Sequence, residues 1–138
     1  MTVHATGSCL CGAIRYEVTE PVTALRVCHC TDCQKATGTG MSVNVVLPAA
    51  ALKILQGKPK SFSKKADSGR TLVRWFCGDC GSPLYSYREN APERIVLRAG
   101  TLDDSSGAKV ASHIWTKSAR PWSSGMPRSV WWAKAVRP

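Results

Sequence analysis

Seven cysteines are the residues of this 138-residue sequence best suited to chemistry, and they fall into three tight groups. The groups have C-x-C, C-x-C-x-x-C and C-x-x-C spacing, and they contain Cys9 and Cys11, then Cys28, Cys30 and Cys33, then Cys77 and Cys80. Clustered cysteines are typical ligands of zinc, whereas cysteines that serve only as small apolar residues have no reason to cluster. The spacing therefore predicts metal binding.

The number of cysteines divides into four plus three. A structural zinc site usually has four protein ligands, and a catalytic site keeps three and leaves one position open. In a strand, the two thiols of the C-x-C group would point to the same face and could bind one ion together with the C-x-x-C turn. The middle group would hold a second zinc ion, with the open position taken by a water or by a substrate thiolate.

Two other arrangements remain open at this stage. His29 could close the second site, although in a strand it would point away from its neighbours Cys28 and Cys30. Alternatively, Cys28 and Cys30 could share an ion with the turn that holds Cys77 and Cys80. In the first arrangement both zinc ions would be structural.

Most of the elements that must position these groups have the period-two pattern of strands. The strands are expected at residues 14–18, 25–30, 41–47, 71–77, 84–87, 95–99 and 113–116. Helix is scarce: residues 31–37 could form two turns, with Thr31 as N-cap and Gly38 as the end, and residues 48–52 another short turn. We predict one domain over residues 1–138, a small, mainly antiparallel β fold clipped by zinc.

The chain carries a formal net charge of +10, which attracts anions without identifying them. Seven cationic residues lie between Lys53 and Arg74, opposed only by Asp67, and are expected to form a solvated basic loop. No apolar stretch is long enough to span a membrane, and no secretory signal is visible. With the many cysteines, these features predict a cytoplasmic protein, because thiols persist in reducing compartments.

Taken together, the motifs resemble the glutathione-dependent formaldehyde-activating enzyme family, also called the centromere protein V family, with the Mss4-like or β-tent zinc fold. The matching segments are residues 9–16, 28–35, 76–84, 99–104, 113–115 and 121–122, within about residues 5–125. One departure is Arg120, which separates Ala119 from Pro121-Trp122, where the family often has alanine directly before Pro-Trp. The resemblance implies four structural zinc ligands, Cys9, Cys11, Cys77 and Cys80, and three active-site ligands, Cys28, Cys30 and Cys33.

The resemblance also implies an activity. It is a carbon–sulfur lyase reaction run in the synthetic direction, which joins formaldehyde to glutathione and gives S-hydroxymethylglutathione. Cys28, Cys30 and Cys33 would be the catalytic residues, two zinc ions the cofactors, and a small thiol and an aldehyde the substrates. Lys35 is a candidate to offset the negative charge of the three thiolates.

The alternative is a zinc scaffold that binds nucleic acid or protein without turnover. We rank nucleic-acid binding below the steering of a small anion, because no nucleic-acid-binding motif accompanies the basic residues. His113 and Trp115 are expected to pack on one face of a strand rather than to line a pocket. Trp75, Trp131 and Trp132 are expected to cover the core or a subunit contact, so a homo-oligomer is possible.

Overall fold

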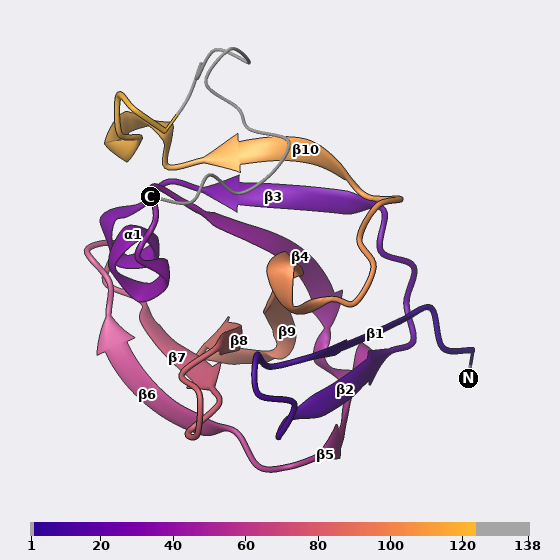
Figure 1. Cartoon of the computed structure of the whole chain (residues 1–138). Helices are drawn as coiled ribbons and strands as arrows, with labels where there is room; N and C mark the ends of the chain where they lie inside the picture. The colour runs from indigo at the N-terminus through magenta and orange to yellow at the C-terminus, as the bar shows by residue number, and fades with distance from the viewer. Residues whose placement is uncertain (1, 124–138) are drawn as a thin grey trace, which may run out of the picture.

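The computed structural model describes residues 2–123, and its strands form two sheets (Figure 1). The smaller sheet has the order β1-β2-β5 and is antiparallel. Its strands are β1 (Ala5–Ser8), β2 (Arg15–Val18) and β5 (Leu52–Gln56). Most residues in regular secondary structure belong to strands, so the prediction of a mainly β fold is confirmed.

The larger sheet has seven strands in the order β10-β3-β4-β9-β8-β7-β6. They are β3 (Ala24–Cys28), β4 (Ser42–Pro48), β6 (Lys60–Lys65), β7 (Thr71–Phe76), β8 (Pro83–Arg88), β9 (Ala91–Arg98) and β10 (Lys109–Ile114). Every neighbouring pair is antiparallel except β10 and β3, which are parallel. The sheet is therefore mixed at one edge and antiparallel elsewhere, in agreement with the predicted mainly antiparallel fold.

The central strands of this sheet present two different faces, because successive side chains of a strand point to opposite sides. One face is apolar, and it packs in the core with Tyr16 and Val18 of β2. Its buried residues include Val45, Leu47, Ile95 and Leu97. The alternate residues of β4 and β9, among them Asn44 and Arg98, face the other side.

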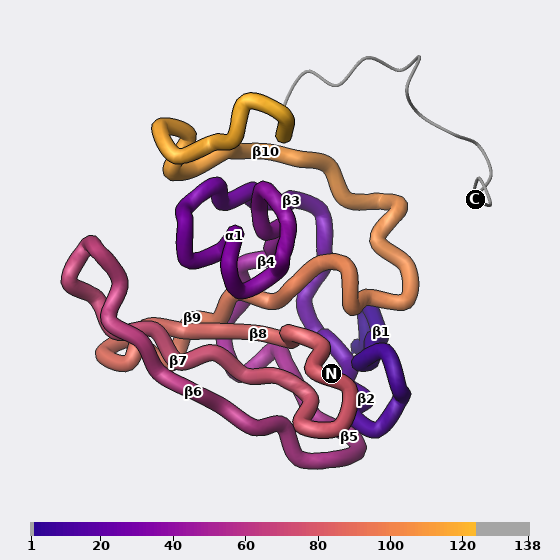
Figure 2. Tube along the Cα trace, turned by 60° about the vertical axis from the view of Figure 1, so that its left-hand side comes forward, coloured from indigo at the N-terminus to yellow at the C-terminus, as the bar shows by residue number. Residues whose placement is uncertain are grey.

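The helix α1 (Thr31–Thr37) lies on that other side, between the β10–β3 end of the sheet and the β6–β9 end (Figure 2). It ends as predicted at Gly38, which adopts a left-handed conformation with φ 72° and donates its N–H to Gln34. The predicted N-cap is wrong by one residue. Cys30 caps the helix instead of Thr31, and its Sγ accepts a hydrogen bond from the Cys33 N–H at 3.3 Å.

Short 3-10 turns complete the described elements: η1 (Ala49–Ala51), η2 (Ala99–Thr101) and η3 (Thr116–Ser118). The last expected strand was placed too late, because Trp115 takes a left-handed φ of 56° and ends β10 before η3. None of the helices in residues 2–123 is both long and apolar enough to cross a membrane. The predictions for Trp131 and Trp132 concern positions outside the described residues.

The expected basic loop is also wrong. Residues 60–65 form β6, an edge strand whose six residues are all exposed, and β5 precedes it. Alternation of Lys and Ser around Phe62 is compatible with a strand, but the run of charges concealed it. Arg74, the last cation of the run, is buried in β7 and not solvated.

Candidate metal centres and the adjoining cavity

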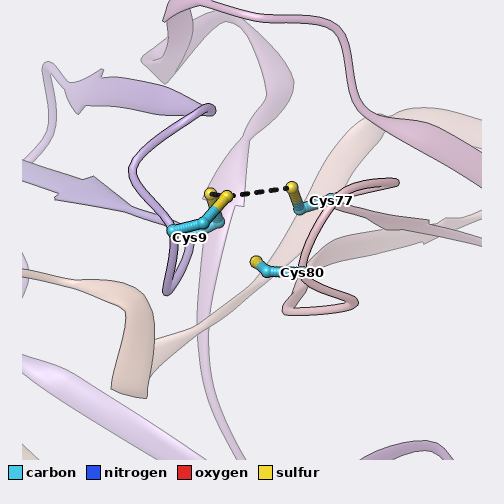
Figure 3. A group of neighbouring side chains, drawn as sticks. Cys9, Cys77 and Cys80 are labelled. Carbon is cyan, nitrogen blue, oxygen red and sulfur yellow. Dashed lines mark hydrogen bonds between the residues drawn. The ribbon is translucent and has the colours of Figure 1, made fainter.

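The first and third cysteine groups meet although 66 residues separate Cys11 from Cys77. The four Sγ atoms of Cys9, Cys11, Cys77 and Cys80 lie within 4.8 Å of one another (Figure 3). The Sγ atoms of Cys9 and Cys11 are 3.6 Å apart, and those of Cys11 and Cys77 are 3.9 Å apart. A tetrahedral zinc ion with bonds of about 2.3 Å separates its sulfur ligands by about 3.8 Å, so the donor set and spacing fit zinc.

Two tight turns, and not a strand, present these thiols. β1 ends at Ser8, so the C-x-C group lies in the turn before β2, contrary to the expected strand placement. Backbone N–H groups of Ile14 and Asp79 donate to the sulfurs of Cys9 and Cys77 at 3.3 and 3.4 Å. Such bonds stabilise thiolates, as a cationic metal also requires.

The glycine after each turn's second cysteine permits this geometry. Gly12 has φ 80° and Gly81 has φ 78°, values that side chains rarely tolerate. In addition, the Ser82 hydroxyl group lies 3.2 Å from Cys80 Sγ and lowers the pKa of this thiol to about 5. These hydrogen bonds therefore favour the thiolate form that zinc binding requires.

The middle cysteine group forms a second, separate cluster beneath α1. Cys28 ends β3, Cys30 caps the helix and Cys33 lies in its first turn. Their three Sγ atoms lie within 4.8 Å of one another, and no histidine or carboxylate of residues 2–123 joins them at that distance. The chain's own cysteines therefore supply three ligands here, a set that fits zinc with one open position.

His29 takes no part in this cluster. Its Nε2 lies 3.0 Å from Nδ1 of His113 on β10, and the two rings stack with centroids 5.2 Å apart. Its backbone N–H donates to the carbonyl of Ile114. The structure thus brings together the residues of neither alternative arrangement. His29 contacts β10, and Cys28 and Cys30 lie apart from the turn that holds Cys77.

Cys33 is the most acidic thiol of the second cluster. Its pKa is lowered to about 5, first by a hydrogen bond from the Cys28 thiol and further by Ser42 and the charge of Arg98, against the opposing effect of burial. The same interaction raises the pKa of Cys28. The lowered pKa of Cys33 favours its thiolate form, and the charge of Arg98 contributes to this effect.

A cavity of about 440 Å³ opens beside the three-cysteine cluster. Its floor is the side of the large sheet that faces away from the core, and α1, the β6–β7 turn and residues 114–118 enclose it. The volume lies within the range of about 300–1,000 Å³ typical of small-molecule sites. The cysteine cluster therefore has room for a substrate next to it.

Cationic side chains dominate the lining of this cavity. Six arginines and Lys117 line it, against two carboxylates, those of Asp32 and Asp67. The arginines are Arg26, Arg70, Arg74, Arg88, Arg94 and Arg98. Asp32 is already paired, since its Oδ1 lies 2.7 Å from Nζ of Lys64. The positive charge of the sequence is thus concentrated where a ligand would sit.

Two of these arginines are buried, Arg74 at 7% and Arg98 at 8% exposure. Arg98 donates a hydrogen bond to Oδ1 of Asn44, which in turn donates to the Ser42 hydroxyl group at 2.8 Å. Burial lowers the pKa of the Arg98 guanidinium; the charge on Cys33 opposes this effect and the charge on Arg74 adds to it. Arg98 therefore connects the cysteine cluster to the cavity floor.

Sequence reasoning missed these arginines. Lys35, the cation it proposed, is exposed on α1 and does not line the cavity. Trp115 does line the cavity, contrary to expectation, while His113 does not. The sequence did contain a signal for them. Arg94 and Arg98 lie four positions apart, so they fall on one face of a strand, and the three residues between them are apolar. A charged residue that faces inward from such a strand needs a partner.

The departure at Arg120 also has a structural role. Its Nε donates to Oε1 of the buried Gln34 on α1 at 2.7 Å. The amide of Gln34 donates in turn to the carbonyls of His29 and Ser118. Arg120 thereby joins the segment after η3 to the helix that carries Cys33.

These features define a β protein with two cysteine clusters, one that includes the core residues Cys9 and Cys77 and one that faces a cationic cavity. Comparison of the sequence with known families agrees with the resemblance that the motifs indicated. The sequence profile of the family described as "Glutathione-dependent formaldehyde-activating enzyme" matches residues 4–118, so the chain belongs to this family.

Individual relatives support the assignment. A protein of Halomonas elongata is 32% identical over 101 residues, 70% of this chain, and one of Sordaria macrospora is 30% identical over 82 residues, 59% of this chain. Both are provisionally named as glutathione-dependent formaldehyde-activating enzymes. The chain spans 64% and 34% of the lengths of these relatives.

The fold also matches a solved structure. A crystal structure of a Rhodobacter sphaeroides protein superimposes with a TM-score of 0.57 at 22% identity, covering 71% of this chain and 87% of the other. At this identity the similarity shows the fold alone.

Proposed function

We propose that this protein joins a small thiol such as glutathione to formaldehyde and gives an S-hydroxymethyl thiol, a carbon–sulfur lyase reaction run in the synthetic direction. The observation that carries the proposal is the three-cysteine cluster, which has no fourth protein ligand within residues 2–123 and faces a cavity of ligand size. The names of the relatives support the choice of thiol and aldehyde.

The two clusters would hold one zinc ion each, with different roles. Cys9, Cys11, Cys77 and Cys80 would bind a structural ion and join the start of the chain to its middle. Cys28, Cys30 and Cys33 would bind the active-site ion, which supplies an open position where a bound thiol loses its proton. Seven free cysteines favour a reducing compartment such as the cytoplasm.

The reaction adds the S–H group across the aldehyde C=O bond. A bond forms between sulfur and carbon, and the π bond of the carbonyl group breaks. The thiol loses one proton, and the former carbonyl oxygen gains one and becomes a hydroxyl group. Nothing is oxidised or reduced. In this step cationic residues of the chain stabilise negative charge. The buried Arg98 stabilises the anionic cysteine cluster, and together with the other arginines of the cavity it stabilises the anionic thiol substrate.

The test is the rate of S-hydroxymethylglutathione formation in a zinc-loaded sample, measured by NMR exchange between free and bound formaldehyde. Wild type is expected to accelerate the reaction above its spontaneous rate, and Cys33→Ser to lose the acceleration. Ser63→Ala, on the exposed strand β6, is the control and should behave as wild type. A wild-type rate equal to the spontaneous rate, with zinc bound, would overturn the proposal.

A further inference from the structure

Arg74 on the cavity floor is buried, and within residues 2–123 it forms no salt bridge, although buried charges are normally paired. Arg74 lies on β7, and across the strands it is paired in register with Ser86, which is paired with Val96. None of these neighbours carries a negative charge. Nε of Arg74 is buried without a hydrogen-bond partner within the described residues, and the same holds for Nε of Arg26.

Arg74 and Arg98 are both buried and line the same cavity, and the charge of Arg74 lowers the pKa of Arg98, so the two guanidinium groups repel each other. The cysteine cluster offsets only one of them. Three thiolates around one Zn²⁺ ion would have a net charge of −1, which would balance a single guanidinium group. Arg98 is the arginine whose pKa the charge on Cys33 raises. Arg74 forms no salt bridge within the described residues, and its charge faces the cavity.

We propose that Arg74 and Arg98, with Arg26 beside them, form an anion-binding subsite that receives an acidic group of the thiol substrate while its sulfur lies at the three-cysteine cluster. Arginine fits this role because its planar guanidinium group donates two parallel hydrogen bonds to a carboxylate, phosphate or sulfonate. Arg26 belongs to the same row, since it is paired in register with Asn44, which is paired with Arg98.

The subsite would determine substrate choice. A thiol with an acidic group brings the missing negative charge to Arg74, and the open Nε donors gain an acceptor. A neutral thiol leaves the buried donors unsatisfied, which disfavours its binding. The substrate class is therefore acidic thiols. The link to the thiol substrate rests on the proposed function, whereas anion binding by the arginines does not.

The experiment is isothermal titration calorimetry on the zinc-loaded protein at constant ionic strength. The probes are inorganic phosphate and three thiols with a common three-carbon chain, namely 3-mercaptopropionate, 3-mercaptopropanesulfonate and the neutral 3-mercaptopropanol. We expect phosphate to bind at one site, and the acidic thiols to bind about 10- to 100-fold more tightly than the neutral one. The two acidic thiols show whether the subsite prefers a carboxylate or a sulfonate.

Arg74→Gln tests the assignment, because Nε of Arg74 makes no hydrogen bond that the fold would lose. It should weaken phosphate binding and abolish the preference for acidic thiols over 3-mercaptopropanol. Arg15→Gln, an exposed arginine on β2 that does not line the cavity, is the matched control and should change neither. Circular dichroism should show that both variants are folded.

The inference is overturned if wild type binds the neutral thiol as tightly as the acidic ones, a result that needs no variant. It is also overturned if a folded Arg74→Gln keeps the full preference. Its failure is distinct from that of the proposed function. If acidic thiols bind preferentially but no reaction with formaldehyde occurs, the proposed reaction is wrong and the subsite stands. If turnover occurs without a preference for acidic thiols, the subsite is wrong and the reaction stands.

Discussion

The two cysteine clusters have similar local chemistry but lie in contrasting surroundings. Cys9 and Cys77 of the four-cysteine cluster belong to the apolar core, and Cys77 is only 1% exposed. Cys28 and Cys33 of the three-cysteine cluster are also buried, but they lie against Ser42 and Arg98 and beside a cavity. Burial of thiols alone therefore does not separate the two centres; the charge and space around them do.

This contrast corresponds to the two faces of one sheet. Along β9, Ile95 and Leu97 face the core, while Arg94 and Arg98 line the cavity. A rigid, well-packed face fixes the strands, and the opposite face can then hold buried charges that would be unfavourable in a flexible setting. The core side should thus govern stability, and the cavity side binding.

The largest expected effect separates the clusters by stability. Cys77→Ser should remove a ligand of the structural zinc ion and destabilise the fold by several kcal/mol, since a structural zinc ion contributes about 10–16 kcal/mol of binding energy to folding. Total stability is only about 5–15 kcal/mol, so much of the chain should unfold. Urea titration followed by circular dichroism measures this. Cys30→Ser, on the cavity side, should remain folded; equal loss in both variants would contradict the contrast.

The second prediction concerns pH on the core side. Burial raises the pKa of Tyr16 to about 12, so its protonated form is favoured in the folded state. The associated stability is fully present below the unfolded pKa of about 10 and is lost as pH rises through about 12. The difference of two pKa units corresponds to about 3 kcal/mol.

Urea titrations between pH 9 and 12 would detect this loss. Tyr16→Phe is the control, because it cannot ionise and should lack this part of the alkaline decline, although it also loses the 2.7 Å hydrogen bond with Thr101. Parallel declines in wild type and Tyr16→Phe would show that Tyr16 is not responsible.

A smaller effect is expected from the polar network on the cavity side. Asn44→Ala would leave the Arg98 guanidinium without its acceptor and should cost about 1–3 kcal/mol. Thermal unfolding of the zinc-loaded protein provides the measurement. Asn90→Ala, at an exposed turn position, should have almost no effect. If Asn44→Ala is as stable as wild type, the network does not hold Arg98 in place.

The smallest effect concerns η3 and the residues that follow it, which Gln34 contacts through Ser118 and Arg120. Arg120→Ala removes the hydrogen bond to Gln34 and should lower stability by about 0.5–1.5 kcal/mol. Hydrogen exchange at the amides of residues 116–119 should increase more than exchange in the core strands. Arg15→Ala, an exposed arginine without a role in this segment, is the matched control. Unchanged exchange would show that this bond does not fix the segment.

The sequence predicted what depends on local spacing. The four-plus-three grouping, the end of α1 at Gly38 and most central strands follow from short motifs and from alternation. The helix N-cap was misplaced because Cys30 uses its sulfur as a cap, a role more typical of Ser, Thr, Asp and Asn.

The cavity could not be predicted in the same way, because it depends on which strands are neighbours. Arg26, Arg74 and Arg98 come from β3, β7 and β9, and only the sheet order places them together. The pairing of β10 with β3 likewise brings His113 to His29 across 84 residues. The charge run that indicated a loop obscured both β6 and the buried position of Arg74.

The number of zinc ions per chain, measured by native mass spectrometry on wild type and on Cys30→Ser, tests the division between the two centres most directly. We expect two ions in wild type, and one in a Cys30→Ser variant that keeps the far-ultraviolet dichroism of the wild type. One ion in wild type, two in folded Cys30→Ser, or an unfolded Cys30→Ser would contradict the division into a structural centre and a substrate-facing centre.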